Sequence, residues 1–329
     1  MVSVCTRVLY QGPEDRIVTG RSMDWKFEMD TNLWAFPRGM KRTGLAGPHS
    51  LEWTSTYGSV VATGYDISTP DGVNEAGLMV NLLWLAESHY PPESSASALS
   101  LSIWGQYVLD NFATVADAVT ALRATPPRVV TTAVPGQDRM AAVHLAMSDT
   151  SGDSAIVEYV DGQQVIHHSR DYLVMTNSPI FAKQLAIDGY WQEIGGTVML
   201  PGTNRAADRF VRASFYIDAV PKSADPVVSV AAVFSVVRNA STPYGIATSD
   251  EPNISSTRWR TVFDHKAKRY FFESVLSPNV FWVDLANLDF SAGGAVRTLA
   301  LGADEKTVHA GESSASFVDA EPFPFLAVS

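Results

Sequence analysis

The most informative part of this 329-residue sequence is its beginning, with CTRVLY at residues 5–10 and TGRSMDW at residues 19–25. Residues 4–10 are rich in types that favour β-strands, GPED at residues 12–15 is typical of a turn, and residues 17–20 resume a strand. The opening therefore predicts a strand, a turn and a second strand, with the only cysteine at the start of the first.

That cysteine, Cys5, excludes an intramolecular disulfide, a zinc ribbon and an iron–sulfur centre because it stands alone. A lone cysteine is most often a small buried hydrophobic residue. At the start of a chain it has a chemical alternative, because a free α-amino group, with a pKa of about 7.7–8.0, can accept the thiol proton without a histidine base. Arg21 could then stabilise the thiolate, and Asp24 could hold the α-ammonium.

The rest of the chain alternates between strand and helix patterns. Further strands are expected at residues 51–61, 77–85, 143–147, 154–160, 163–168, 258–264, 269–273 and 280–284. Turns are expected at Asp71-Gly72 and Asp161-Gly162. Helices are expected at residues 99–109, from a Thr114 cap to about 123, and at 206–216 and 227–238. No repeat or linker divides the chain, so we expect one α+β domain of antiparallel sheets covered by helices.

Five motifs in order carry a resemblance to a known family. They are CTR at 5–7, GRSMDW at 20–25, DGVNE at 71–75, MTNSP at 175–179, and LPGTNR at 200–205 running on to DRFVR at 208–212. The chain resembles the choloylglycine hydrolase and penicillin V acylase family of N-terminal-nucleophile hydrolases, closest to its Gram-negative penicillin V acylase-like branch. The resemblance implies a four-layer αββα sandwich in one catalytic domain, residues 5–329, with residues 1–4 removed on maturation.

The same resemblance assigns catalytic roles. Cys5 matches the nucleophile, Arg21 the arginine beside the thiolate, and Asp24 the aspartate that binds the α-amine. Asn177 matches the asparagine whose amide donates to the oxyanion hole, and Arg209 the arginine that supports the charge network.

The second oxyanion donor implied by the resemblance is the backbone N–H of Trp84, where bile-salt hydrolases have asparagine and other acylases tyrosine. Trp25 and Trp84 could form a flat slot for an aryl or long acyl chain, and Met23 is assigned to the same substrate site.

Each of these residues also has a plainer interpretation on sequence alone. Arg21 and Asp24 could form an ion pair on a surface turn. Asn177 is an ordinary turn residue before Ser-Pro, and Arg209 could face solvent from a helix. The two tryptophans could be core aromatics. The pair His167-His168 lies in an expected strand, where neighbouring side chains face opposite ways, so the two cannot share one ion.

The expected reaction is hydrolysis of a linear, non-peptide amide through a thioester on Cys5, with no metal or organic cofactor. Phenoxymethylpenicillin or an N-acyl-homoserine lactone is the favoured substrate, and a conjugated bile salt is the alternative. A papain-like cysteine hydrolase with a histidine base also stays open. A rival of another class is an unprocessed, non-catalytic small-molecule-binding protein of the same fold.

That last rival matters because Cys5 follows Val4 in this sequence. While the Val4–Cys5 peptide bond stands, the nitrogen of Cys5 is an amide and cannot act as a base. The bond must be cut, by attack of the thiol on the preceding carbonyl or by another protease.

Composition excludes some partners. The net charge of −11 argues against a nucleic-acid surface, which needs clustered lysine and arginine. No run approaches the roughly 18 apolar residues of a membrane-spanning helix, so no membrane partner is expected. Localisation is open: cytoplasmic as written, periplasmic if a leader has been removed. The resemblance implies a homotetramer, although the segment that helps assemble tetramers in bile-salt hydrolases is shorter here.

Overall fold

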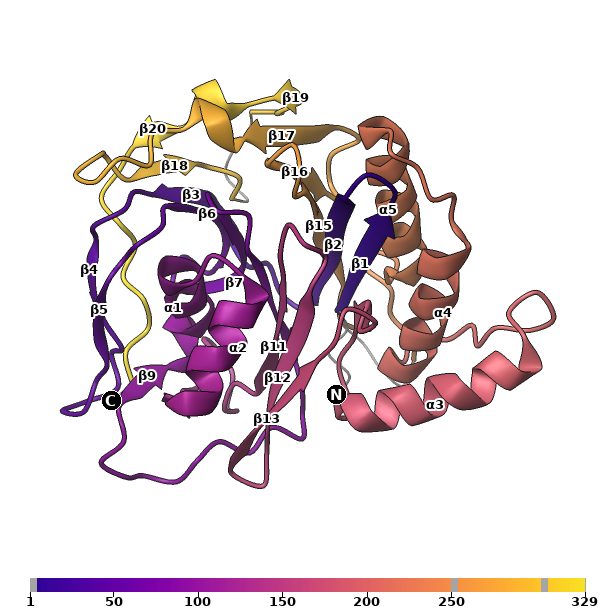
Figure 1. The fold of residues 1–329 in the computed structure, drawn as a ribbon, viewed down its shortest axis with the longest axis horizontal. Helices are drawn as coiled ribbons and strands as arrows, with labels where there is room; N and C mark the ends of the chain where they lie inside the picture. Colours follow the sequence, from indigo (N-terminus) through magenta and orange to yellow (C-terminus); the bar gives the residue numbers. More distant parts are fainter. Residues whose placement is uncertain (1–4, 250–253, 303–306, 329) are drawn as a thin grey trace.

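The computed structural model describes residues 5–249, 254–302 and 307–328. The expected removal of residues 1–4 falls outside these ranges. Two large sheets of mainly antiparallel strands pack face to face at the centre (Figure 1). The seven-stranded sheet has the order β14 (Val174–Met175), β1 (Thr6–Gly12), β2 (Arg16–Trp25), β15 (Ser256–Asp264), β16 (Arg269–Ser274), β17 (Val280–Asp284) and β19 (Gly311–Glu312).

The nine-stranded sheet carries the other wall of the sandwich. Its order is β13 (Gln163–His168), β12 (Ser154–Val160), β11 (Val143–Ser148), β8 (Met79–Trp84), β7 (Ser68–Asn74), β6 (Ser59–Gly64), β3 (Leu33–Phe36), β18 (Arg297–Leu299) and β20 (Val318–Asp319). Two small sheets pair β4 (Lys41–Thr43) with β5 (Glu52–Thr54), and β9 (Ala98–Ser100) with β10 (Arg128–Val130).

Helices cover the outer faces of both sheets (Figure 1). On the nine-stranded sheet lie α1 (Trp104–Asn111) and α2 (Val115–Ala124), and on the seven-stranded sheet lie α4 (Ala206–Ala219) and α5 (Pro226–Ala240). Helix α3 (Phe181–Ile194) packs against α4. Short 3-10 helices are η1 (Leu101–Ile103), η2 (Leu285–Asn287) and η3 (Ser314–Ser316). The layers run helix, sheet, sheet, helix, which confirms the expected αββα sandwich.

Strand β2 shows why the opening sequence settles this architecture. All ten of its residues are buried, because β1 and β15 pair with its two edges and α5 covers one face. Successive side chains of such a strand face the two buried sides of the sheet. A polar side chain is therefore tolerated only where it has a hydrogen-bond or ion-pair partner. The apolar residues between the sheets and under α4 and α5 form one core, and those under α1 and α2 form a second.

Several local predictions are confirmed. The Asp161-Gly162 turn joins β12 and β13 with φ values of 51° and 77°, as a two-residue hairpin requires. Thr114 caps α2 by accepting a hydrogen bond from the backbone N–H of Asp117 at 3.1 Å. The helix expected at residues 99–109 is confirmed in part, since α1 begins at Trp104 after a short strand and a 3-10 turn.

The turn predicted at Asp71-Gly72 is wrong, because both residues lie inside β7. Asp71 is buried and accepts a hydrogen bond from Asn81 at 2.6 Å, so its polarity serves an interior network rather than a turn. Gly72 is required for packing, because a Cβ there would lie 2.7 Å from Val61 Cγ1. The real turn follows Asn74, whose side chain accepts from Gly77 and Leu78 N–H groups at 3.0 Å.

Helix α3 was not expected. Its buried residues, Phe181, Gln184 and Asp188, include two polar ones, and no side chain caps its start. The helix therefore lacks both an apolar stripe and a start signal. In the described residues, no helix combines the length and the hydropathy that spanning a membrane would require.

Candidate active site

Cys5 lies at the start of β1 and is buried, with 3% of its surface exposed. The β1–β2 register pairs Thr6 with Ser22, which places Cys5 opposite Met23. Residues opposite each other on paired strands share a face of the sheet, so the side chain of Cys5 lies beside those of Arg21 and Met23. Its Sγ is 3.7 Å from Arg21 Nη2 and 4.0 Å from Met23 Sδ.

The thiol of Cys5 needs a base. Burial raises its pKa above the ordinary value, and the nearby Arg21 guanidinium opposes that rise only in part. In the described part of the chain, the hydrogen-bond partners of Sγ are Arg21, Met23 and the backbone oxygen of Asp24 at 3.8 Å. Histidine is not among them, so this geometry gives no support to a papain-like mechanism.

Arg21 is fully buried and held from several sides. Its Nη1 lies 3.5 Å from Asp71 Oδ2, and its guanidinium lies 5.0 Å from the ring centre of Trp259. Its Nη2 donates to the carbonyl of Leu82 at 3.1 Å. That carbonyl is available because Pro70, opposite Leu82 in the β7–β8 ladder, has no N–H to donate. The interpretation of Arg21 and Asp24 as an ion pair on a surface turn is therefore wrong, because both side chains are buried.

Asp24 is buried with one carboxylate oxygen unpaired. Ser22 Oγ donates to Oδ2 at 3.4 Å, whereas Oδ1 finds no hydrogen-bond partner among the described residues. Burial raises the pKa of Asp24 to about 6, against the lowering effects of Arg209 and of the Thr257 hydroxyl beside the carboxylate. A buried, unpaired carboxylate oxygen costs free energy unless a donor approaches it.

Asn177 and Arg209 meet Cys5 from the other side. The backbone N–H of Cys5 donates to Asn177 Oδ1, and Arg209 Nη2 donates to the same oxygen at 2.9 Å. Arg209 Nη1 donates to the carbonyl of Cys5 at 2.6 Å and to Thr6 Oγ1 at 2.5 Å. Both side chains are buried, so the surface-helix interpretation of Arg209 is wrong, and Asn177 does more than form a turn.

These contacts fix how the amide of Asn177 is oriented. Because Oδ1 faces two donors, Nδ2 must point the other way, where it donates to the carbonyl of Trp84 at 2.8 Å. An amide nitrogen carries two hydrogens, so one N–H of Asn177 is left for another acceptor.

The backbone N–H of Trp84 points toward the same region. The N–H of Leu85 bonds to Ala142 in the β8–β11 ladder, so the peptide groups of Trp84 face the opposite edge of β8. The β7 register on that edge pairs residues 71–73 with 79–81 and ends before Trp84. Among the described residues, the Trp84 N–H therefore has no partner in either ladder.

An apolar cavity of about 130 Å³ opens beside Cys5. Trp25 and Trp84 both line it, with ring centres 5.9 Å apart and planes inclined at 49°. The indole N–H of Trp25 donates to the hydroxyl of Tyr65 at 2.7 Å. Met23 also lines the cavity, so the structure brings together all three predicted substrate residues.

Sequence reasoning missed two features near this site. His144 and Glu158 face each other across β11 and β12, with His144 Nδ1 2.9 Å from Glu158 Oε1 and His144 Nε2 2.8 Å from the carbonyl of Thr176. Each of these two residues is a polar side chain within an otherwise apolar strand, and this pattern could have indicated the pair from sequence. Arg139, over the indoles of Trp25 and Trp84, lies in a loop and left no such signal.

Burial by itself raises the pKa of Glu158, but hydrogen bonds from His144 and His167 reverse the effect and lower it to about 2. His167 Nε2 lies 3.3 Å from Glu158 Oε2, whereas His168 Nε2 lies 2.8 Å from Asp153 Oδ2. The two neighbouring histidines therefore serve different partners, as strand alternation predicts.

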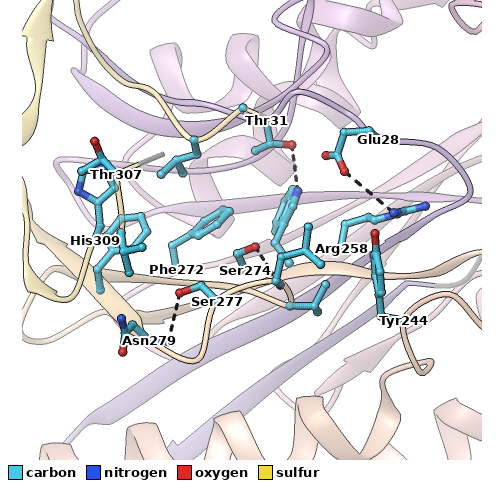
Figure 2. A pocket seen from close by; sticks show the side chains of 17 residues that line it. Glu28, Thr31, Tyr244, Arg258, Phe272, Ser274, Ser277, Asn279, Thr307 and His309 are labelled. Atoms are coloured by element: carbon cyan, nitrogen blue, oxygen red, sulfur yellow. Dashed lines mark hydrogen bonds and ion pairs between the residues drawn. The ribbon is translucent and has the colours of Figure 1, made fainter. Parts of the chain in front are cut away.

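A second cavity, of about 280 Å³, lies elsewhere in the molecule (Figure 2). Trp259 lines this cavity and also contacts the guanidinium of Arg21. At its edge Arg258 lies 4.0 Å from Glu28, and Thr31 accepts the indole N–H of Trp259 at 3.0 Å. Among the described residues, none that the sequence predicted for the site lines this cavity. The reactive groups gather instead at the smaller cavity beside Cys5.

Known proteins are similar to this chain in sequence and in fold. The profile of the linear amide C–N hydrolases, choloylglycine hydrolase family, matches residues 5–297. A penicillin V acylase from Pectobacterium atrosepticum is 54% identical over 344 residues, covering 98% of this chain and 92% of the relative. The structure of a penicillin V acylase from Agrobacterium tumefaciens is 60% identical and superposes with a TM-score of 0.91, over 98% of this chain and all of that chain.

A conjugated bile acid hydrolase from Clostridium perfringens shares the fold at a TM-score of 0.78 and 20% identity, covering 93% of this chain and 99% of that one. The profile match spans most of the chain, and the closer relatives cover nearly all of it. With the sandwich and the gathered site, this establishes a penicillin V acylase-like amide hydrolase. The chain belongs to the choloylglycine hydrolase family of linear amide C–N hydrolases.

Proposed function

We propose that Cys5, freed of residues 1–4, is the nucleophile of this hydrolase and that its own α-amine is the base. The observation that carries the proposal is the unpaired Oδ1 of Asp24, buried within the cluster around Cys5. An α-ammonium on Cys5 would supply a charged donor for this oxygen. Cutting the Val4–Cys5 bond, by the Cys5 thiol itself or by another protease, creates that group.

The reaction then proceeds in two halves. The amine takes the thiol proton, Sγ attacks the amide carbonyl, and negative charge develops on the carbonyl oxygen. The free N–H of Asn177 and the N–H of Trp84 donate to this oxyanion. The resulting ammonium protonates the leaving nitrogen as the C–N bond breaks, leaving a thioester on Cys5.

Water completes the cycle. The amine, now neutral, removes a proton from water, whose oxygen attacks the thioester carbonyl. The carboxylic acid leaves and the thiol is restored with its proton. Arg21 stabilises the thiolate in both halves, and Arg209 holds Asn177 and the Cys5 carbonyl in place.

For the acyl group we propose an aryl-acetyl or fatty-acyl chain, as in penicillin V or an N-acyl-homoserine lactone. The narrow cavity between the indoles of Trp25 and Trp84 supports a flat or slender apolar group over a steroid. The relatives from Pectobacterium and Agrobacterium are both penicillin V acylases.

Turnover of a small panel tests this proposal. The wild-type chain should release phenoxyacetate from penicillin V, and the acid from N-acyl-homoserine lactones, faster than it hydrolyses glycocholate. Cys5→Ala should abolish all three, and mass spectrometry should detect an acylated Cys5 in the wild type. Retained turnover in Cys5→Ala would overturn the assignment of the nucleophile.

We also propose that the chain assembles as a homotetramer. The exposed apolar side chains Tyr190, Val198 and Met199, on α3 and the loop after it, support a protein–protein contact there.

A further inference from the structure

Arg139 stands beside the substrate cavity on the loop between β10 and β11. Its Cζ lies 4.2 Å from the ring centre of Trp84 and 5.3 Å from that of Trp25. Residues 132–135 of the same loop line the cavity, and a bridge between Ala133 and Met140 ties the loop's ends together. The fold therefore holds a cation against the two indoles next to Cys5.

Among the described residues, none is a counter-ion for Arg139. Its Nε is buried without a hydrogen bond, and its guanidinium forms no ion pair or side-chain hydrogen bond with any described residue. Other arginines near the site are engaged: Arg21 by Asp71 and Leu82, Arg258 by backbone carbonyls. A partly desolvated guanidinium without an acceptor costs free energy, which a bound anion would recover.

Stacking on an indole leaves a guanidinium ready for such an anion. The ring contacts the flat face of the group, whereas its N–H bonds point outward along the edge. That edge matches the two oxygens of a carboxylate in a bidentate pair. A lysine could supply the positive charge but not the two parallel N–H donors of a planar guanidinium.

The cavity itself cannot take a charge. Its wall beside Cys5 is formed largely by apolar side chains, among them Met23, Leu82 and Val134. A carboxylate placed there would lose its hydration without gaining a partner. An acyl group in the cavity therefore leaves any charge on the amine half of the substrate, outside the apolar slot whose indoles Arg139 covers.

We propose that Arg139 is an anion-recognition residue, which pairs with a carboxylate on the amine half of the substrate and selects such amides over neutral ones. This inference rests on the proposed function, since it assumes that the acyl group enters the cavity beside Cys5. Arg139 alone then determines the selectivity between substrates whose amine half carries a carboxylate and substrates whose amine half is neutral.

The test uses penicillin V and its methyl ester, which share every group except the charged carboxylate. The readout is the ratio of kcat/KM for the acid to kcat/KM for the ester. Arg139→Gln should lower this ratio about tenfold, and Arg139→Lys should lower it less, because charge is kept but the fork is lost. Arg123→Gln removes the same charge from an exposed position on α2 and should leave the ratio unchanged.

A binding measurement separates this inference from the proposed function. Titration of Cys5→Ala chains, followed by tryptophan fluorescence, gives Kd for the acid and the ester without turnover. Tighter binding of the acid, lost in Cys5→Ala/Arg139→Gln, supports the role of Arg139 even if the wild type hydrolyses neither compound. Equal losses for acid and ester, or no loss for either, would show that Arg139 only braces the indoles and would overturn the inference.

Discussion

At the scale of single residues, the site is built from groups that are costly to bury. Asp24 has an unpaired oxygen and a pKa raised by burial to about 6, and the Cys5 thiol is held neutral by its own desolvation. Such costs are expected where a site is prepared for a group that arrives later, and we propose that this group is the α-ammonium of Cys5.

Asp24→Asn should therefore stabilise an unprocessed chain. In Cys5→Ala chains whose intact mass shows that residues 1–4 are retained, the substitution should raise the free energy of unfolding at pH 7 by about 2–3 kcal/mol. The folded-state pKa of about 6 lies above the ordinary 3.8, so the folded state binds the proton more tightly. The cost of burying the ionised aspartate thus grows as pH rises from about 4 to about 6. The increase in the free energy of unfolding that Asp24→Asn produces should grow over the same range.

Urea denaturation at pH 4, 5, 6 and 7 measures this effect. Asp161→Asn, in an exposed turn where asparagine also accepts a positive φ, is the matched control. A benefit of Asp24→Asn that is the same at every pH would contradict the account.

Asn177→Ala tests the oxyanion contact. Removing one preorganised donor should lower kcat by about 10²–10³-fold with little change in KM, because the contact is made mainly in the transition state. Single-turnover acylation by penicillin V isolates that step. A fall of less than about tenfold would show that Asn177 does not donate to the oxyanion.

At the scale of elements, β11 and β12 hold Asn177, the proposed oxyanion donor, although neither strand carries Cys5. Both ring nitrogens of His144 face atoms that only accept, a Glu158 oxygen and the carbonyl of Thr176. The ring therefore bridges Glu158 and Thr176, which ties β11 and β12 to the residue before Asn177. Helix α3 is joined as well, because the Phe181 N–H donates to Glu158 at 3.0 Å.

His144→Gln should cost about 1–3 kcal/mol in the free energy of unfolding, because it removes the ring that contacts both the buried Glu158 carboxylate and the Thr176 carbonyl. Adding Glu158→Gln should recover part of that loss. A double-mutant cycle by urea denaturation measures the coupling. Strictly additive losses would show that the two residues act independently.

Elements with a strong local pattern were predictable from sequence, and those defined by distant partners were not. The β12–β13 hairpin and the capped helix α2 carry their own turn and cap residues. Asp71-Gly72 has turn composition yet lies in β7, because its partners come from strands the local window cannot see.

The same division applies to the site. Cys5, Arg21 and Asp24 stand on adjoining positions of one strand pair, so spacing and family resemblance placed them together. Arg139 joins them only through a loop that folds over the indoles, and nothing in its neighbouring sequence indicates that fold. Tertiary packing alone brings it there.

At the scale of the whole molecule, the sandwich brings residues far apart in sequence to one point: Cys5 from the first strand, Trp84 from the opposite sheet and Arg209 from a covering helix. Helix α3 and the following loop extend away from the sheets (Figure 1). Their apolar side chains Tyr190, Val198 and Met199 are exposed.

We expect size-exclusion chromatography with light scattering to give the mass of four chains. Val198→Lys combined with Tyr190→Lys should shift the protein toward smaller species, because burying unpaired charges at a contact is costly. Asp218→Lys, on α4, is a control for added positive charge. A monomer at every concentration would refute the tetramer.

The most direct test of the central claim is the intact mass of the purified protein, combined with N-terminal sequencing. The account predicts a chain that begins at Cys5 and lacks Met1–Val4, with Cys5→Ala expressed in parallel to show whether the thiol itself cuts the bond. An active wild-type enzyme that still carries Val4 would contradict it, because Cys5 would then have no amine to serve as the base.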